Sequence, residues 1–211
     1  MFPLLKYTAE QVDDYFAKVT PEMVEASLAK DRHDWFDLLN LISPAAYPFM
    51  DAMRKKARLA RIKYYGKTVS VYAPLYIGNT CVNHCRYCDF RREHTGTVRR
   101  NLTLDEIRVE AEAIRESGID NLLIVAGEDP KVNSVEHFCD VARLLKPMFS
   151  NLSLEVAPQT EEGYRAMFKA GFESLTCFQE TYDQERYKYF HPAGPKSNYD
   201  FRLWTQLRAG K

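Results

Sequence analysis

The sequence lacks several features that would place it in large classes of protein. No apolar run approaches the ~20 residues that a membrane-spanning helix needs. The 29 Lys and Arg residues are balanced by 29 Asp and Glu residues, so no net charge draws the chain to nucleic acid or to an anionic membrane. The apolar run within residues 1–6 is too short for a signal peptide, and acidic residues follow soon after it. We therefore expect a soluble, cytoplasmic protein that binds neither nucleic acid nor membrane.

Cysteine is also scarce, and its count is odd. The chain has five cysteines, of which Cys81, Cys85 and Cys88 lie within eight residues. An odd count with a tight cluster favours metal ligation in a reducing compartment over a framework of disulfides. Soft thiolates select zinc, copper(I) or iron–sulfur clusters, and a structural zinc site usually has four protein ligands.

No obvious fourth ligand accompanies these thiols. Cys139 and Cys177 fall in helix-like and strand-like segments and are interpreted as small buried hydrophobes, while His84 is held between two candidate ligands. Three thiolates without a fourth favour a four-iron cluster that keeps one iron open to another molecule. A zinc knuckle or a set of reduced structural thiols is the alternative.

The first third of the chain predicts helices. Within residues 1–66, Thr8, Thr20 and Ser43 are expected to cap helices, and Gly66 is expected to end the last one. That last helix carries a basic run, which is interpreted as a solvated face, with binding of an acidic partner as the alternative.

From residue 67 the pattern changes to strands that alternate with helices. The strands are expected at residues 69–76, 121–126, 152–157 and 174–178. The helices are expected to begin after Thr103, Ser134 and Thr160 and to cover residues 182–189 and 199–207. This alternation predicts a parallel sheet with right-handed crossovers. Because an eight-stranded barrel takes ~250 residues, four strands amount to about half of one, with open edges at the first and fourth strands.

The cysteine motif resembles a known family. Its C-x3-C-x2-C spacing, with Tyr87 before the last cysteine, resembles the radical S-adenosylmethionine (SAM) enzymes. The longer run from Tyr72 to Cys88 is similar to the tyrosine-lyase branch, and residues 41–46 resemble the lead-in of its thiamine-synthesis members, the 2-iminoacetate synthases. The resemblance covers about the N-terminal half of the family. It implies a partial (β/α) barrel of about four parallel strands in residues 67–211, preceded by a helical region in residues 1–66.

The resemblance also implies cofactors and the residues that hold them. A 4Fe-4S cluster would be ligated by Cys81, Cys85 and Cys88, and SAM would bind to its open iron. Ligands of parallel α/β folds lie beyond the carboxyl ends of the strands. The candidates for SAM binding are Tyr87, Ala126, Gly127, Glu128, Glu155, Gln179 and Glu180. Three of these, residues 126–128, resemble the family's Gly-Gly-Glu motif, with alanine in the first position.

Individual roles differ among these candidates. Glu155 lies on a buried strand and needs a partner, either the ribose hydroxyls of SAM or a salt bridge to a barrel Lys or Arg. Tyr87 is expected to pack on the adenine, Tyr76 to line the substrate pocket, and the Gln179–Glu180 pair to orient SAM or substrate. A turn or capping role is expected for His191.

The implied reaction is the cleavage of tyrosine. By resemblance, a 5′-deoxyadenosyl radical abstracts hydrogen from the tyrosine amine, and the Cα–Cβ bond breaks to give 2-iminoacetate (dehydroglycine) and p-cresol. The implied partners are an electron donor such as flavodoxin or ferredoxin, and thiazole synthase or a chain that supplies the rest of the barrel. The alternatives are a hydrogenase-maturation tyrosine lyase and a partial chain that only binds the cluster and SAM. Residues after Lys211 would separate them.

Overall fold

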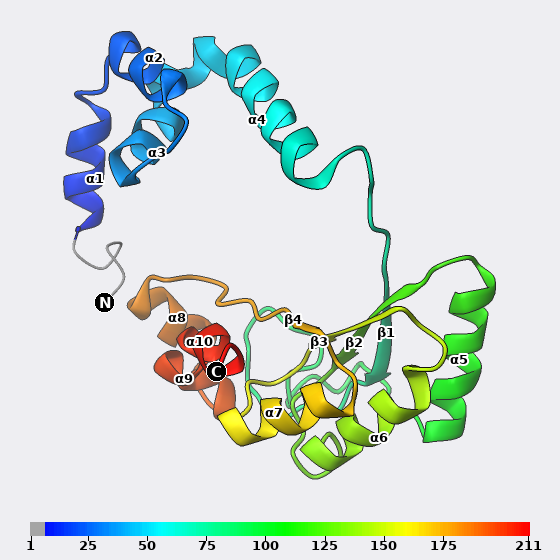
Figure 1. Cartoon of the computed structure of the whole chain (residues 1–211). Helices are drawn as coiled ribbons and strands as arrows, with labels where there is room; N and C mark the ends of the chain where they lie inside the picture. Colours follow the sequence, from blue (N-terminus) through cyan, green and yellow to red (C-terminus); the bar gives the residue numbers. More distant parts are fainter. Residues whose placement is uncertain (1–6) are drawn as a thin grey trace. The chain divides into compact units, whose positions relative to one another are not determined.

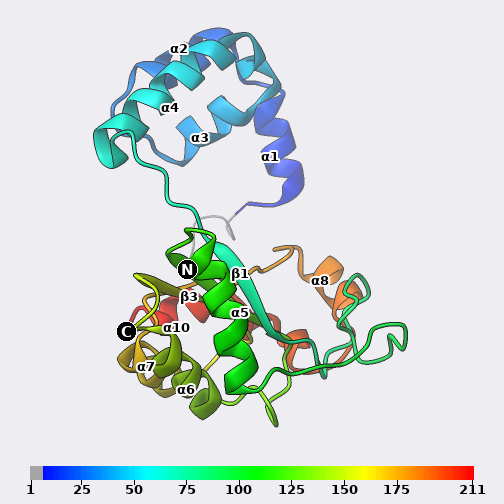
Figure 2. The ribbon, with the colours of Figure 1, turned by 90° about the vertical axis from the view of Figure 1, so that its right-hand side faces the viewer.

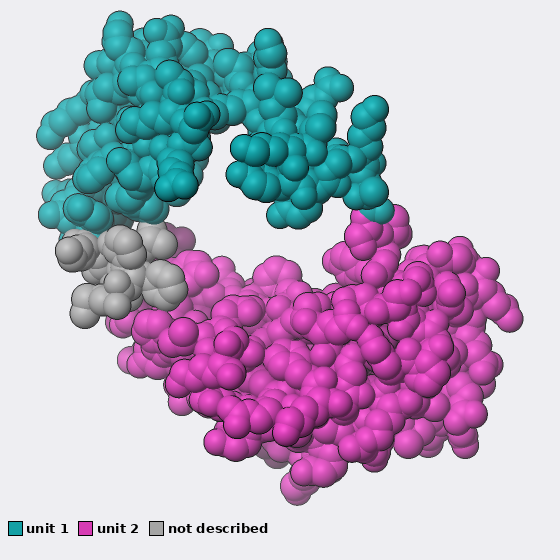
Figure 3. All heavy atoms as spheres, viewed as in Figure 1, with its two compact units in different colours: residues 1–69 teal, residues 70–211 magenta. Residues whose placement is uncertain are grey.

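The chain folds into two compact units. The computed structural model describes residues 7–211, and the units comprise residues 1–69 and 70–211 (Figure 3). Each unit has its own cluster of buried apolar side chains. The expectation for residues 1–6 lies outside the described residues. None of the helices between residues 7 and 211 combines the length and apolarity that crossing a bilayer requires.

The N-terminal unit is helical (Figure 1). Its elements are α1 (Ala9–Phe16), α2 (Pro21–Ala29), α3 (Trp35–Ile42), the 3-10 helix η2 (Pro44–Phe49) and α4 (Met50–Tyr65). Thr8 and Thr20 cap α1 and α2 through their side chains, as predicted, and Gly66 ends α4 with a φ of 62°. Ser43 also occupies the N-cap position, before Pro44 in η2, but its hydroxyl donates to the Asn40 carbonyl, so η2 has no side-chain cap bond.

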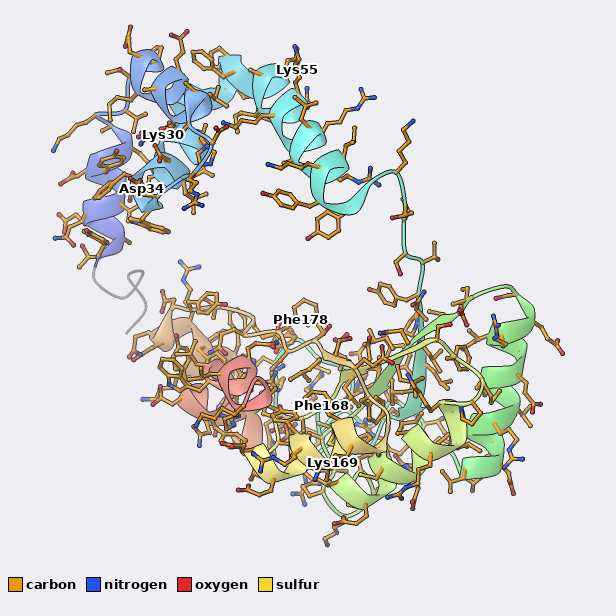
Figure 4. The ribbon with its side chains drawn as sticks, in the orientation of Figure 1. Lys30, Asp34, Lys55, Phe168, Lys169 and Phe178 are labelled. Carbon is orange, nitrogen blue, oxygen red and sulfur yellow. The ribbon has the colours of Figure 1, made fainter. Side chains whose placement is uncertain are left out.

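A buried carboxylate joins α2 to α3. Asp37 accepts hydrogen bonds from Lys30 Nζ at 2.7 Å and from the Ser27 hydroxyl at 2.7 Å. Its other oxygen accepts the backbone N–H of Asp34, which caps α3 (Figure 4). The hydrogen bond from Lys30 is the main reason why the pKa of Asp37 lies well below its usual range. No residue of α4 is buried, in line with a solvated basic face, although Lys56 also donates to the Leu28 carbonyl.

The second unit contains one parallel sheet in the order β1-β2-β3-β4. The strands are β1 (Ala73–Gly78), β2 (Asn121–Ala126), β3 (Asn151–Glu155) and β4 (Ser174–Leu175). The connecting helices α5 (Leu104–Glu116), α6 (Val135–Leu145) and α7 (Glu161–Ala170) lie along one side of the sheet (Figures 1 and 2). The remaining elements are α8 (Gln184–Phe190), η3 (Pro195–Ser197), α9 (Tyr199–Leu203) and α10 (Thr205–Ala209). This architecture confirms the predicted four-stranded parallel α/β fold.

The two faces of the sheet differ in burial. Alternate residues of a strand point to opposite faces. One set is buried with side chains of α5, α6 and α7: Leu75, Ile77, Leu122, Ile124, Leu152 and Leu154. The other set includes Tyr76, which is 55% exposed, and the partly exposed Ser153 and Glu155. The helices therefore form the core with one face, and the other face remains available for a site.

Both edge strands differ from their predicted extents. The first strand begins at Ala73 rather than residue 69, since the pairing with β2 starts at Leu122 and nothing continues the ladder before it. The fourth strand ends at Leu175 rather than residue 178. The ladder with β3 stops at the Leu154–Leu175 pair, and farther along the chain the Phe178 carbonyl accepts from the Arg202 guanidinium at 2.9 Å instead of from a neighbouring strand.

The expected helix at 199–207 is divided into α9 and α10 at Trp204. The Phe201 carbonyl accepts from the Arg208 guanidinium at 2.6 Å and from the Thr205 hydroxyl at 3.4 Å. These side-chain donors occupy the carbonyl that a continuous helix would have bonded to the backbone N–H of Thr205.

Candidate functional site

A cavity lies at the carboxyl ends of the strands and is lined by all three clustered cysteines. The cysteines belong to the cysteine loop, residues 79–101, which connects β1 to α5. Seven residues are predicted to bind SAM. Five of them, which lie on a strand or after its end, also line the cavity: Ala126, Gly127, Glu128, Glu155 and Glu180. The fold thus brings together predicted site residues that are up to 99 residues apart, from Cys81 to Glu180.

Three predicted site residues do not line this cavity. The Tyr76 ring contacts Phe90, which does line it, with the ring centroids 6.3 Å apart. The Tyr87 hydroxyl lies 2.6 Å from His191 Nε2. Gln179 is buried, and neither of its amide atoms has a hydrogen-bond partner within residues 7–211.

Asn83 organises the cysteine loop around the cavity. It is 2% exposed, and its Nδ2 donates to Glu128 Oε2 at 2.6 Å and contacts Cys81 Sγ at 3.6 Å. Its Oδ1 accepts the backbone N–H of Lys196 at 2.7 Å. A second bond, from Val82 N–H to the Glu128 carbonyl at 2.8 Å, ties the loop to the end of β2. One buried amide thus fixes a cysteine, a carboxylate and a distant segment in a single geometry.

Gly127 is required by close backbone packing. A Cβ at this position would lie 2.3 Å from the Thr80 carbonyl oxygen and 3.0 Å from its carbon. The Gly127 N–H donates to the Gly78 carbonyl, so the residue cannot simply move away. Absence of a side chain lets the cysteine loop pass directly over the end of β2. Ala126 stands where the family's motif has its first glycine, and it packs its methyl group against the core.

Charged groups of both signs face the cavity. Lys196 Nζ bonds Glu180 at 2.7 Å, and the Lys196 side chain is only 15% exposed. Burial tends to raise the pKa of Glu180, but the hydrogen bond and charge of Lys196 outweigh burial and lower it. Glu155 has no hydrogen bond or ion pair within residues 7–211, and burial followed by the charge of Glu180 raises its pKa. Glu180 also has a φ of 70°, a conformation uncommon for a residue with a side chain.

The thiols have different surroundings. Burial is the main cause that raises the pKa of Cys85, and the charge of Lys196 opposes it. Cys88 Sγ accepts the Phe90 N–H at 3.3 Å. Among the described residues, no group of three or more His, Cys, Asp or Glu side chains is placed to hold a single metal ion. Three thiols that share one cavity fit a multi-iron group, which offers a separate iron to each cysteine.

The two other cysteines differ from each other. Cys139 is 6% exposed within the core, as predicted. The prediction for Cys177 is wrong, because this thiol is half-buried, lines the cavity and accepts from the Arg202 guanidinium at 3.2 Å. Sequence patterns gave no site role to Asn83, Lys196 or Arg202. Lys196 and Arg202 follow the last strand at a distance, and no local spacing signals that they return to the cavity.

Known proteins resemble this chain over most of its length. Residues 75–205 match the Radical SAM superfamily profile. The chain is 34% identical to 2-iminoacetate synthase of Salmonella typhimurium over 197 residues, covering 92% of this chain and 50% of the relative. It is also 34% identical to 2-iminoacetate synthase of Escherichia coli, covering 89% and 50%. The chain thus spans about half the length of the curated relatives that it matches.

Solved structures show the same fold. The structure of HydG, a maturase of the FeFe-hydrogenase, superposes with a TM-score of 0.86 at 30% identity, covering 96% of this chain and 47% of HydG. Methylornithine synthase (PylB) superposes with a TM-score of 0.66 at 20% identity and supports the fold alone. The matched span includes the cysteine loop, most of β1 and the whole of β2, β3 and β4, and the chain belongs to the radical SAM superfamily.

Proposed function

We propose that the cavity holds a 4Fe-4S cluster ligated by Cys81, Cys85 and Cys88. The observation that carries this proposal is the shared cavity, in which three thiols of one loop face carboxylates from the ends of β2 and β3. Asn83 fixes the loop relative to Glu128, so the thiols and the carboxylate keep one arrangement. Family membership implies the same cofactors.

SAM is the second proposed ligand. Its methionine moiety carries an ammonium and a carboxylate, and the cavity offers groups of both signs. Glu128 and the carbonyls beside Gly127 would receive the ammonium, while Lys196 and Arg202 are cations that would balance the carboxylate. Glu155, whose carboxylate has no partner in residues 7–211, would bind the ribose hydroxyls. Ala126 and Glu180 complete the lining, and Gln179, Tyr87 and Tyr76 support it from outside the cavity.

The proposed reaction is cleavage of the Cα–Cβ bond of tyrosine to 2-iminoacetate and p-cresol, for synthesis of the thiamine thiazole. Bound cluster and SAM would supply a 5′-deoxyadenosyl radical. The chain's own residues would orient SAM, through the contacts above, and exclude water from one side of the cavity. Similarity to 2-iminoacetate synthases over most of this chain supports this reaction. The HydG superposition supports a hydrogenase-maturation lyase as the second candidate.

Several further assignments accompany this proposal. We place the chain in the cytoplasm, where cysteine ligands stay reduced. Its partners would be an electron donor such as flavodoxin or ferredoxin, and thiazole synthase or a chain that supplies the other half of the barrel. The helical region, residues 1–66, would precede the barrel part, residues 67–211.

Metal analysis tests the cluster directly. Anaerobically reconstituted protein should bind about four irons and give a reduced-state EPR signal that changes when SAM is added. Replacement of any one of Cys81, Cys85 or Cys88 by Ala should abolish both properties. Cys139→Ala is the matched control, because this thiol is buried in the core away from the cavity. Stoichiometric zinc in anaerobically purified protein, with no uptake of iron, would contradict the proposal.

A further inference from the structure

The turn between Cys85 and Cys88 is held from outside by a distant part of the chain. We define the clamp segment as residues 187–197, which run from the end of α8 through η3. The backbone N–H of Arg86 donates to the Phe190 carbonyl at 3.0 Å, and the N–H of His84 donates to the Ala193 carbonyl at 3.3 Å. The Arg86 guanidinium also lies over the Tyr189 ring, 4.3 Å from its centroid.

His191 connects this clamp segment to the other central residue of the turn. It is 1% exposed, and its Nε2 lies 2.6 Å from the Tyr87 hydroxyl. Its Nδ1 lies 2.8 Å from the Tyr187 carbonyl, which can only accept. Nδ1 therefore carries the proton of a neutral ring, and Nε2 is left as the acceptor of the Tyr87 O–H. Burial lowers the pKa of His191, which favours the neutral ring.

The clamp segment itself is tightly constrained. The buried Tyr187 donates its hydroxyl to the Lys196 carbonyl at 2.6 Å, and the Lys196 N–H donates to Asn83. Gly194 has a φ of 89°, and a Cβ there would lie 2.8 Å from the Asn83 Cα. The segment therefore fits against the cysteine loop on both sides of His191.

We propose that His191 is a positioning residue, which fixes the Cys85–Cys88 turn by accepting the Tyr87 hydroxyl while the clamp segment binds the backbone of the same turn. This inference rests on the proposed function, because the turn is taken to carry two of the three cluster ligands. Rigidity of the ligand turn would slow loss of the cluster, since ligands held in place rebind iron before it escapes.

Two substitutions separate this role from general support. His191→Asn keeps a donor for the Tyr187 carbonyl but removes the acceptor at Nε2. His191→Gln places an amide oxygen within reach of Tyr87 and gives up the Tyr187 contact. Tyr87→Phe removes only the hydroxyl. Tyr199→Phe is the control, because it removes a hydroxyl that donates to the Tyr182 carbonyl at 2.9 Å rather than to the cysteine loop.

The loaded chain gives the first readout, the rate at which a chelator removes iron. His191→Asn and Tyr87→Phe should each lose iron about five-fold faster, the effect of one net hydrogen bond, while His191→Gln and Tyr199→Phe stay near the wild-type rate. The double variant Tyr87→Phe/His191→Asn should lose iron no faster than Tyr87→Phe alone, because that variant already removes the bond to His191 together with the hydroxyl's interaction with Glu180. Equal rates for the Asn and Gln variants, or additive effects in the double variant, would overturn the proposal.

The second readout uses the chain without a cluster. It separates the proposal about His191 from the proposal that the cavity holds a cluster. Nitrogen-15 NMR should find His191 as the neutral Nδ1–H tautomer, and Tyr87→Phe should speed exchange of the Arg86 amide about five-fold. If the wild type takes up no iron, the cluster proposal fails, while these two measurements still decide the role of His191. An Nε2–H tautomer, or unchanged Arg86 exchange in Tyr87→Phe, rejects the His191 role even if iron binds. Tyr87→Phe also covers the case in which the His191 variants do not fold.

Discussion

Gly127 is where the cysteine loop and the end of β2 approach most closely. In Gly127→Ala the new methyl group would meet the Thr80 carbonyl at 2.3 Å, and the contact is backbone rather than a flexible side chain. Overpacking of this kind costs about 1–3 kcal/mol, so we expect a lower urea midpoint and reduced iron uptake. Gly210→Ala is the matched control, because its nearest neighbour would be 3.4 Å away. Equal midpoints for the two variants would contradict this explanation of the glycine.

Glu155 gives a prediction with a definite pH dependence. Burial and the charge of Glu180 raise its pKa above the usual 4.5, which means that folding disfavours the charged form. The carboxyl therefore costs stability at neutral pH and ceases to do so as pH falls below 4.5. Glu155→Gln should unfold at higher urea concentration at neutral pH, by less than about 1 kcal/mol because the group is partly exposed. The gain should shrink as the solution is acidified, and a pH-independent gain would exclude this origin.

Sequence reasoning found the residues that carry local signals. Each of these signals spans only a few consecutive residues: the cysteine spacing, the turn at residues 127–128 and the threonine caps. Lys196, Arg202 and the Asn83 amide were missed as site groups because their roles depend on contacts across up to 113 residues, as in the Asn83–Lys196 bond. Tyr87 was found, but its hydroxyl partner, His191, was given only a turn role, since 104 residues separate them. Local patterns predict candidate ligands better than they predict the contacts that hold those residues in place.

At the scale of the elements, the edge strands depart most from expectation. Central strands β2 and β3 have neighbours on both sides, and their extents agree with the predicted ranges to within two residues. Strands β1 and β4 have one neighbour each in the described sheet, and both are shorter than their apolar runs. Strand propensity alone does not set the length of an edge strand, because a residue extends the strand only where its backbone groups bond a neighbouring strand, and the Phe178 carbonyl bonds Arg202 instead.

The open edge of β4 leads to a prediction about association. Phe178 follows β4 and is 57% exposed (Figure 4). We expect the chain of residues 1–211 to associate through this edge. The Phe178→Lys substitution should shift the association equilibrium toward the monomer, because lysine on an edge opposes strand pairing. Val98→Lys, at a site that is 86% exposed in the cysteine loop, is the control for added charge. Sedimentation measurements that find the wild type monomeric, or both variants alike, would contradict this expectation.

For the whole molecule, the described sheet supplies one side of the proposed SAM site but no enclosure. The cysteines, Glu128 and Glu155 face one cavity, whereas β1 and β4 both have a free edge within residues 7–211. A radical formed there would be open to water, and enclosure is what suppresses such side reactions. We therefore expect the chain of residues 1–211, given reductant, SAM and tyrosine without oxygen, to release 5′-deoxyadenosine without p-cresol.

A version extended to full barrel length is the comparison for this assay. Closing the barrel would add the missing side of the cavity, so the extended version should form p-cresol in proportion to the SAM that it cleaves. The ratio of p-cresol to 5′-deoxyadenosine is the quantity to measure, because it reports coupling independently of how much cluster each preparation contains. If residues 1–211 alone, as a monomer, reach the same ratio and a comparable rate, four strands suffice for control of the radical, and the enclosure argument is wrong.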